Sequence, residues 1–188
     1  MSLFHKLFLA YFPRVPPAWQ LAVLAFALLV FLLCVWRGAR LSRCLALTAL
    51  LSYCLLLLVM LVLARSARQE SAVILAPFYS YRKIFAFTKG SFEWLCLDIF
   101  NCLLYLPLGL FYAAWRHISD KPPDRLPLYT AAFGFVLSLL IEILQYVLRR
   151  GVFEPDDLLH NTLGALLGAL LWHGAVVILA RCKRRFHP

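Results

Sequence analysis

Apolar residues in this chain form five long runs that would be hydrophobic around the whole circumference of a helix. The runs cover residues 18–36, 44–63, 92–115, 126–148 and 158–180. At about 1.5 Å per residue the first run reaches roughly 28 Å, which is enough to cross the hydrocarbon core of a bilayer. Helices that are apolar on every side need an apolar solvent. The pattern therefore predicts an all-α polytopic membrane protein, a helical bundle of about five transmembrane helices.

Two of the runs contain residues with a predicted structural role. The third run carries Pro107 and Gly109, and Pro107 is expected to kink the helix because it has no backbone N–H to donate. The fifth run has Gly164 and Gly168 at a spacing of four, the pattern that lets two membrane helices approach closely. We assign all four residues to helix packing.

Outside the spans, two segments mix polar and apolar residues. Residues 1–17 place aromatic and leucine side chains at helical spacing, which predicts a short interfacial N-terminal helix; a disordered tail is the alternative. The connection at 64–91 combines basic and aromatic residues, which favours a loop folded against the membrane interface. Residues 18–188 are then a single transmembrane domain, with no internal repeat in the sequence.

Composition supports the membrane assignment and narrows the partners. Hydrophobic residues make up 63% of the chain and the mean hydropathy is +0.81, so a soluble fold would expose large apolar patches. The net charge of +10 is carried between the runs, where basic residues meet anionic headgroups, and no nucleic-acid-reading motif accompanies it. The six cysteines lie mostly in apolar runs and are interpreted as small buried residues. We expect membrane lipids as partners and no nucleic acid.

The distribution of lysine and arginine predicts the orientation. Both sides of a five-span protein would carry similar numbers, but on one side the basic residues sit in short segments tight against the span ends, at 37–43, 116–125 and 181–185. The positive-inside rule has most force for such segments. We expect the N-terminus outside and the C-terminus in the cytoplasm.

A few polar residues fall inside or at the ends of the spans, where an unpaired charge costs at least about 2.5–3.5 kcal/mol. They are Asp98, Asn101, Glu142, Gln145, Asp157, His160 and Asn161. With five alternating spans, all seven are predicted to lie at the outer end of the bundle. Glu142 and Gln145 are three residues apart and so share a helix face, and Arg149, seven residues from Glu142, is predicted to lie on that face too.

Structural explanations for these residues remain open. Glu142, Gln145 and Arg149 would also serve as polar contacts between helices. Asp156 and Asp157 follow Pro155, where acidic side chains favour the positive end of a helix dipole.

Catalytic and metal chemistry find less support in the sequence. Glu154, Asp156, Asp157 and His160 would offer metal ligands, but no zinc spacing such as HExxH is present. Ser138 lacks a histidine placed by sequence to activate it. We predict no metal, no cofactor and no catalytic residue.

Three blocks resemble the VanZ-like membrane protein family. They are Asn101-Cys-Leu-Leu-Tyr-Leu-Pro107-Leu-Gly109, then Ser138-Leu-Leu-Ile-Glu142-Ile-Leu-Gln145, then Asp157-Leu-Leu-His-Asn161-Thr-Leu-Gly164-Ala-Leu-Leu-Gly168. Arg65 and the segment Ala76-Pro77-Phe78 look like earlier family positions, so the resemblance covers about residues 60–172. The family usually shows Arg-x-Phe-Asp before the last block, where this chain has Arg150-Gly-Val-Phe153-Glu154.

The resemblance implies a multi-pass protein of the bacterial cytoplasmic (inner) membrane, in a family whose named member is associated with low-level resistance to the glycopeptide teicoplanin. Our leading hypothesis is a non-enzymatic protein that binds an envelope lipid, a lipid-linked wall precursor or a glycopeptide at the outward-facing polar cluster. The predicted ligand-binding residues are Arg65, Asn101, Glu142, Gln145, Arg149, Asp157 and Asn161. The alternative is an intramembrane enzyme acting on a lipid headgroup, with Glu142 or Asp157 as general base. The sequence predicts no oligomeric state.

Overall fold

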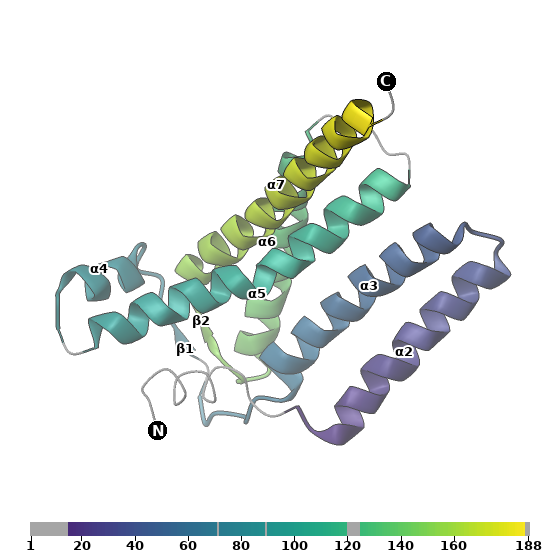
Figure 1. The fold of residues 1–188 in the computed structure, drawn as a ribbon. Helices are drawn as coiled ribbons and strands as arrows, with labels where there is room; N and C mark the ends of the chain where they lie inside the picture. The colour runs from purple at the N-terminus through teal and green to yellow at the C-terminus, as the bar shows by residue number, and fades with distance from the viewer. Residues whose placement is uncertain (1–14, 71, 89, 120–124, 187–188) are drawn as a thin grey trace.

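The computed structural model describes residues 15–70, 72–88, 90–119 and 125–186 and is mainly helical (Figure 1). Its elements, in chain order, are α2 (Pro17–Trp36), α3 (Leu41–Leu58), the π-helix η1 (Val59–Leu63), β1 (Ala72–Val73), α4 (Tyr79–Phe85), α5 (Ser91–Ile118), α6 (Leu126–Val147), β2 (Val152–Phe153) and α7 (Pro155–Phe186). Within these residues five helices are long and apolar enough to cross a membrane, with η1 continuing α3. The predicted helical class and the five spans are confirmed. The predicted interfacial helix falls almost entirely on residues 1–14, outside the described residues.

Helix α5 lies at the centre of the bundle. In Figure 1, α7 lies on one side of α5 and α3 followed by α2 lies on the other, while α6 crosses behind α5. Helix α2 has no buried residue and packs mainly on α3, so most of its surface is left for lipid. The spans differ in role: α2 is an outlying anchor, whereas α3, α5, α6 and α7 enclose the protein interior.

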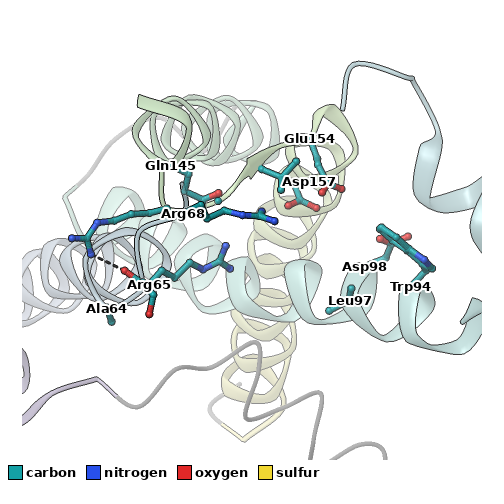
Figure 2. A pocket seen from close by; sticks show the side chains of 13 residues that line it. Ala64, Arg65, Arg68, Trp94, Leu97, Asp98, Gln145, Glu154 and Asp157 are labelled. Carbon is teal, nitrogen blue, oxygen red and sulfur yellow. Dashed lines mark hydrogen bonds between the residues drawn. The ribbon is translucent and has the colours of Figure 1, made fainter. Parts of the chain in front are cut away.

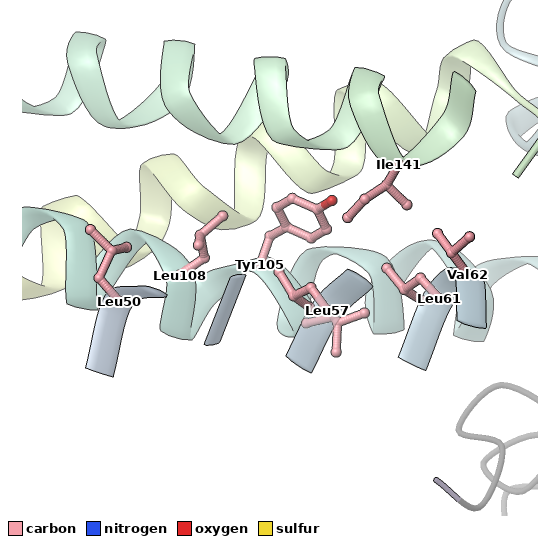
Figure 3. Packing of buried hydrophobic residues seen from close by; sticks show 8 residues of the cluster. Leu50, Leu57, Leu61, Val62, Tyr105, Leu108 and Ile141 are labelled. Carbon is pink, nitrogen blue, oxygen red and sulfur yellow. The ribbon is translucent and has the colours of Figure 1, made fainter. Parts of the chain in front are cut away.

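The apolar interior is formed where α3 and η1 meet α5 and α6. Its buried members are Leu50, Leu57, Leu61, Val62, Leu104, Tyr105, Leu108 and Ile141 (Figure 3). Tyr105 is fully buried in the middle of this cluster. These contacts align the end of η1 with α6, which is where the functional site begins.

Small residues bring α5 and α7 into backbone contact. A Cβ atom added at Gly109 would overlap the Ala165 carbonyl, and one added at Gly164 would overlap the Cys102 carbonyl. Gly168 lies equally close to the Leu106 carbonyl. Three of the four residues assigned to packing therefore lie at one interface, and any side chain there would push the two helices apart.

Pro107, the fourth, lies inside α5, which continues through it as one helix. Because Pro107 has no N–H to donate, it forms no hydrogen bond to the Leu103 carbonyl. The hydroxyl of Tyr53, from α3, donates a 2.7 Å hydrogen bond to the neighbouring Leu104 carbonyl. A side chain from the adjacent span thus binds the backbone next to the proline.

The connections at one end of the bundle have more structure than the sequence predicted. Strands β1 and β2 pair in parallel, with Ala72 opposite Val152 and Val73 opposite Phe153. The short helix α4 packs beside the start of α5, where Tyr79 and Trp94 make an edge-to-face ring contact. These elements tie the connection between η1 and α5 to the connection between α6 and α7.

Candidate functional site: a charged cavity where four helix ends meet

A cavity of about 500 Å³ opens where η1 ends, α5 begins, α6 ends and α7 begins. We call it the charged cavity; its lining residues are Ala64, Arg65, Ser66, Arg68, Trp94, Leu97, Asp98, Gln145, Arg150, Gly151, Val152, Glu154 and Asp157 (Figure 2). Three of the seven residues predicted to bind a ligand line it, namely Arg65, Gln145 and Asp157. Of the polar residues that the topology predicted to converge, Asp98, Gln145 and Asp157 border this volume, which is suited to a small ligand or headgroup.

The cavity has a basic side and an acidic side. Arg65 and Arg68 follow η1 and extend into the cavity from one side, close to Gln145 (Figure 2). Asp98, Glu154 and Asp157 lie on the other side, with the ring of Trp94 next to Asp98 (Figure 2). The charge of Arg65 also interacts with the carboxylates of Glu142 and Asp157. The arrangement can accept both an anionic and a cationic group.

Arg150, on the basic side, binds backbone carbonyls at the C-terminal end of the second span. Its Nη1 atom donates to the Leu63 carbonyl at 2.6 Å and to the Arg65 carbonyl at 2.7 Å, and it lies 3.5 Å from the Val62 carbonyl. Carbonyls at a helix C-terminus have no partner within the helix, and a cation there also favours the helix dipole. Sequence reasoning placed Arg150 at the arginine of the family's Arg-x-Phe-Asp pattern but did not predict that it binds these carbonyls.

Gln145 acts at the same helix end. Its side-chain amide donates a 3.0 Å hydrogen bond to the Leu61 carbonyl, inside the π-helical turn. A π-turn shifts the backbone hydrogen bonds by one residue and is frequent at functional sites. The predicted site residue Gln145 therefore lines the cavity and also fixes the shape of η1.

Two further predicted residues lie just behind the cavity wall. The amide of Asn101 donates a 2.6 Å hydrogen bond to Oδ1 of Asp157, which joins α5 to α7. Glu142 is only 2% exposed, and its Oε2 atom accepts a 3.2 Å hydrogen bond from the backbone N–H of Glu154. These contacts hold Asp157 and Glu154 at the cavity surface.

Asn161 and Arg149 lie away from the cavity lining. Asn161 is buried between α7 and α6, where its amide donates a 2.8 Å hydrogen bond to the Ser138 hydroxyl. The prediction that Arg149 shares a helix face with Glu142 is wrong: α6 ends at Val147 and Arg149 has a left-handed backbone with φ 56°. Arg149 is exposed, and its side chain lies 3.3 Å from the Gln69 carbonyl. Helical spacing failed there because the helix had already ended.

Asp156 has a role that its position at the start of α7 did not reveal. Its carboxylate accepts hydrogen bonds of 2.9 Å from the backbone N–H groups of Phe78 and Ser80, and one of 3.1 Å from the Ser80 hydroxyl. Phe78 is the residue just before α4 and Ser80 lies in its first turn, where N–H groups lack partners within the helix. Asp156 therefore caps α4, not the helix that carries it.

His160 connects α4 to the acidic side of the cavity. Its Nε2 atom lies 3.5 Å from Oδ2 of Asp98 and 3.0 Å from the hydroxyl of Tyr81. The Tyr81 and His160 rings also face each other, with centroids 5.5 Å apart. Burial, followed by the charges of Asp98 and Asp156, raises the pKa of the Tyr81 hydroxyl.

Glu154 lies in the connection before α7 and is the acidic lining residue outside the spans. Burial raises the pKa of its carboxyl, and the nearby charges of Asp156 and Asp98 raise it further. Among the described residues, no three His, Cys, Asp or Glu side chains are grouped to hold a metal ion. The described site offers hydrogen bonds and charge to a ligand.

The fold and this cavity define a polytopic helical membrane protein with a polar site at one end of its bundle. The family model VanZ/LLP1 matches residues 50–179, a range that includes every residue lining the cavity. The chain therefore belongs to the VanZ-like family, as the three sequence blocks indicated.

A curated relative supports the same assignment over a shorter range. Protein VanZ of Enterococcus faecium is 33% identical over 72 residues, which is 38% of this chain and 41% of the relative. The match thus spans less than half of that relative's length. No solved structure matches the chain.

Proposed function

We propose that the protein binds the charged headgroup of an envelope lipid, a lipid-linked wall precursor or a lipid-bearing glycopeptide in the charged cavity. The observation that carries this proposal is the cavity itself, which brings arginines and carboxylates together at the converging ends of four helices. Arginine is well suited to phosphate and carboxylate groups because its planar guanidinium donates in pairs. A ligand with a lipid tail would place that tail along the apolar helices.

The predicted residues divide into two roles under this proposal. Arg65, Gln145 and Asp157 line the cavity and would contact the ligand. Asn101 and Glu142 would position the lining, because they bond to Asp157 and to the Glu154 backbone. Arg68 joins the ligand-contacting group, since it extends into the cavity beside Arg65 (Figure 2).

We further propose that the protein resides in the bacterial cytoplasmic membrane with the charged cavity on the outer side. This placement rests on the basic residues near the opposite span ends, such as Arg37 and Arg40 beside α2 and α3. It would bring the cavity to the face of the membrane that glycopeptides reach. Labelling of single cysteines introduced at positions 70 and 40 in a cysteine-free chain tests it. A membrane-impermeant reagent should reach only position 70 in intact cells; labelling of position 40 alone would reverse the orientation.

The function is tested by expressing the chain in a glycopeptide-susceptible Gram-positive host. Teicoplanin susceptibility and binding of fluorescent teicoplanin to cells are compared for the parent chain, Arg65→Gln and Arg40→Gln. Arg40 is exposed at the opposite end of the bundle and serves as the matched control. We expect the parent and Arg40→Gln to alter susceptibility and Arg65→Gln to lose the effect at equal expression. Equal behaviour of all three variants would contradict the site assignment.

The enzymatic alternative has its own readout. Purified protein incubated with radiolabelled envelope lipid would release or modify the headgroup if Glu142 or Asp157 acted as a general base. Chromatographic detection of such a product, lost in Asp157→Asn, would favour the enzyme over the binding protein.

A further inference from the structure

The charges around the cavity favour a ligand that carries a positive group as well as a negative one. Its lining holds three arginines and three carboxylates, and Arg150 already binds backbone carbonyls. Arg65 and Arg68 then face Asp98, Glu154 and Asp157 across the cavity (Figure 2). Within proteins, like charges that lie close together repel more strongly than in water, because the effective dielectric constant is lower. A purely anionic group would gain from the arginines but be repelled by the carboxylates.

We infer that the ligand group is a zwitterion, a phosphate joined by a short linker to a primary ammonium, as in a phosphoethanolamine headgroup. This inference rests on the proposed headgroup-binding function and specifies its substrate class. The phosphate would lie on the side of Arg65 and Arg68, and the ammonium would lie among Asp98, Glu154 and Asp157. A primary ammonium has three N–H donors and so matches carboxylate acceptors, whereas a quaternary ammonium has none.

The acidic side is built into the protein interior. Asp98 is only 8% exposed; Ser80 and His160, whose Nε2 atom lies 3.5 Å from Oδ2, stabilise its charge, but the buried Oδ2 atom forms no hydrogen bond within the described residues. A buried carboxylate without enough partners is costly, and a cation entering the cavity would reduce that cost. The raised pKa of Glu154 has the same origin in burial and neighbouring acids.

Trp94 adds a second feature suited to a cation. Its side chain lines the cavity and lies next to Asp98 (Figure 2). The face of an indole ring attracts cations, most strongly where water is excluded. Carboxylates and an aromatic ring on one side, with arginines on the other, match the two ends of one zwitterionic headgroup.

The test uses the purified, delipidated full chain and lipids with short acyl chains. Binding of dioctanoyl phosphatidylethanolamine, phosphatidylglycerol and phosphatidylcholine is measured by native mass spectrometry and by thermal shift. We expect phosphatidylethanolamine to bind about tenfold more tightly than either of the others, since one charge-assisted hydrogen bond is worth about that factor. Soluble sn-glycero-3-phosphoethanolamine is the fourth probe. If this soluble compound binds more weakly than the lipid, the natural ligand is the lipid; if it binds equally well, the natural ligand is the soluble compound. Both results support a zwitterionic ligand.

Matched variants separate the two ends of the site. Glu154→Gln should weaken phosphatidylethanolamine binding about tenfold and leave phosphatidylglycerol binding unchanged or tighter, whereas Arg68→Gln should weaken both. Arg40→Gln should change neither, and far-UV circular dichroism checks that every variant is folded. Equal affinity for phosphatidylethanolamine and phosphatidylglycerol, unaffected by Glu154→Gln, would overturn the zwitterion while leaving headgroup binding intact. Absence of binding to all four probes would also overturn the zwitterion, while the teicoplanin comparison of the parent chain with Arg65→Gln tests the proposed function separately.

Discussion

The side-chain amide of Asn101 donates a 2.6 Å hydrogen bond to the carboxylate of Asp157, across 56 residues of sequence. Asn101 comes from α5 and Asp157 from the first turn of α7, so the bond joins the two helices directly behind the charged cavity. Both residues belong to the blocks shared with the VanZ-like family. Their pairing gives the shared residues a physical role, which is to fix a carboxylate at the cavity wall.

Replacing Asn101 by leucine should destabilise the protein by about 1–3 kcal/mol, because the half-buried Asp157 carboxylate would lose its hydrogen bond from α5. Thermal unfolding in detergent, followed by tryptophan fluorescence, measures the effect. Leu103→Ala is the control, since Leu103 is 54% exposed on the lipid-facing side of the same helix. A loss no larger for Asn101→Leu than for Leu103→Ala would show that the bond contributes little.

The close contact between α5 and α7 predicts different effects for alanine at two glycines of α7. Gly168→Ala should cost about 1–3 kcal/mol, because its Cβ atom would overlap backbone atoms of α5. Gly174→Ala, six residues along the same helix, should be neutral or stabilising by up to about 1 kcal/mol, because nothing lies within 4 Å of an added Cβ and alanine favours the helix. Unfolding midpoints of the two variants in one detergent compare them directly. Equal shifts would mean that α5 and α7 separate without cost.

The spans were predictable because a bilayer imposes one strong condition. Backbone N–H and C=O groups in lipid must form hydrogen bonds within the protein, so a long apolar run that crosses the bilayer forms a helix. The convergence of Asp98, Glu142 and Asp157 followed from counting alternating spans. The hydrophobic pattern therefore predicted the fold class, and the alternating topology predicted the end of the bundle at which polar residues gather.

The contacts that hold the cavity's walls in place could not be predicted, because they join segments that are distant in the sequence. Nothing near Arg150 in the sequence shows that its partners are carbonyls of the second span, and nothing near Asp156 shows that it caps α4. The π-turn at η1 lies in a run of aliphatic residues that would suit an α-helix equally well. Local pattern gives element type, whereas these features arise only from tertiary packing.

The adjacent arginines offer a direct test of that distinction. Arg150→Gln should lower the unfolding midpoint, because the carbonyls of Leu63 and Arg65 would lose their donor, at a cost of about 1–3 kcal/mol. Arg149→Gln should change stability by less than about 0.5 kcal/mol, since Arg149 is exposed and makes one long contact. Both variants remove one positive charge, so the loss of charge alone would not produce a difference between them. Equal destabilisation would contradict the assigned role of Arg150.

Asp156 should control the order of α4 independently of the bundle. Removing its carboxylate in Asp156→Ala leaves the N–H groups of Phe78 and Ser80, at the start of α4, without their acceptor, which costs about 0.5–2 kcal/mol for a helix cap. Hydrogen–deuterium exchange should then accelerate across residues 78–85, while α5 and α6 keep their protection. Ser80→Ala removes only the 3.1 Å hydroxyl bond and should accelerate exchange less. Unchanged exchange at 78–85 in Asp156→Ala would show that the ring contacts of Tyr79 and Tyr81 suffice to hold α4 in place.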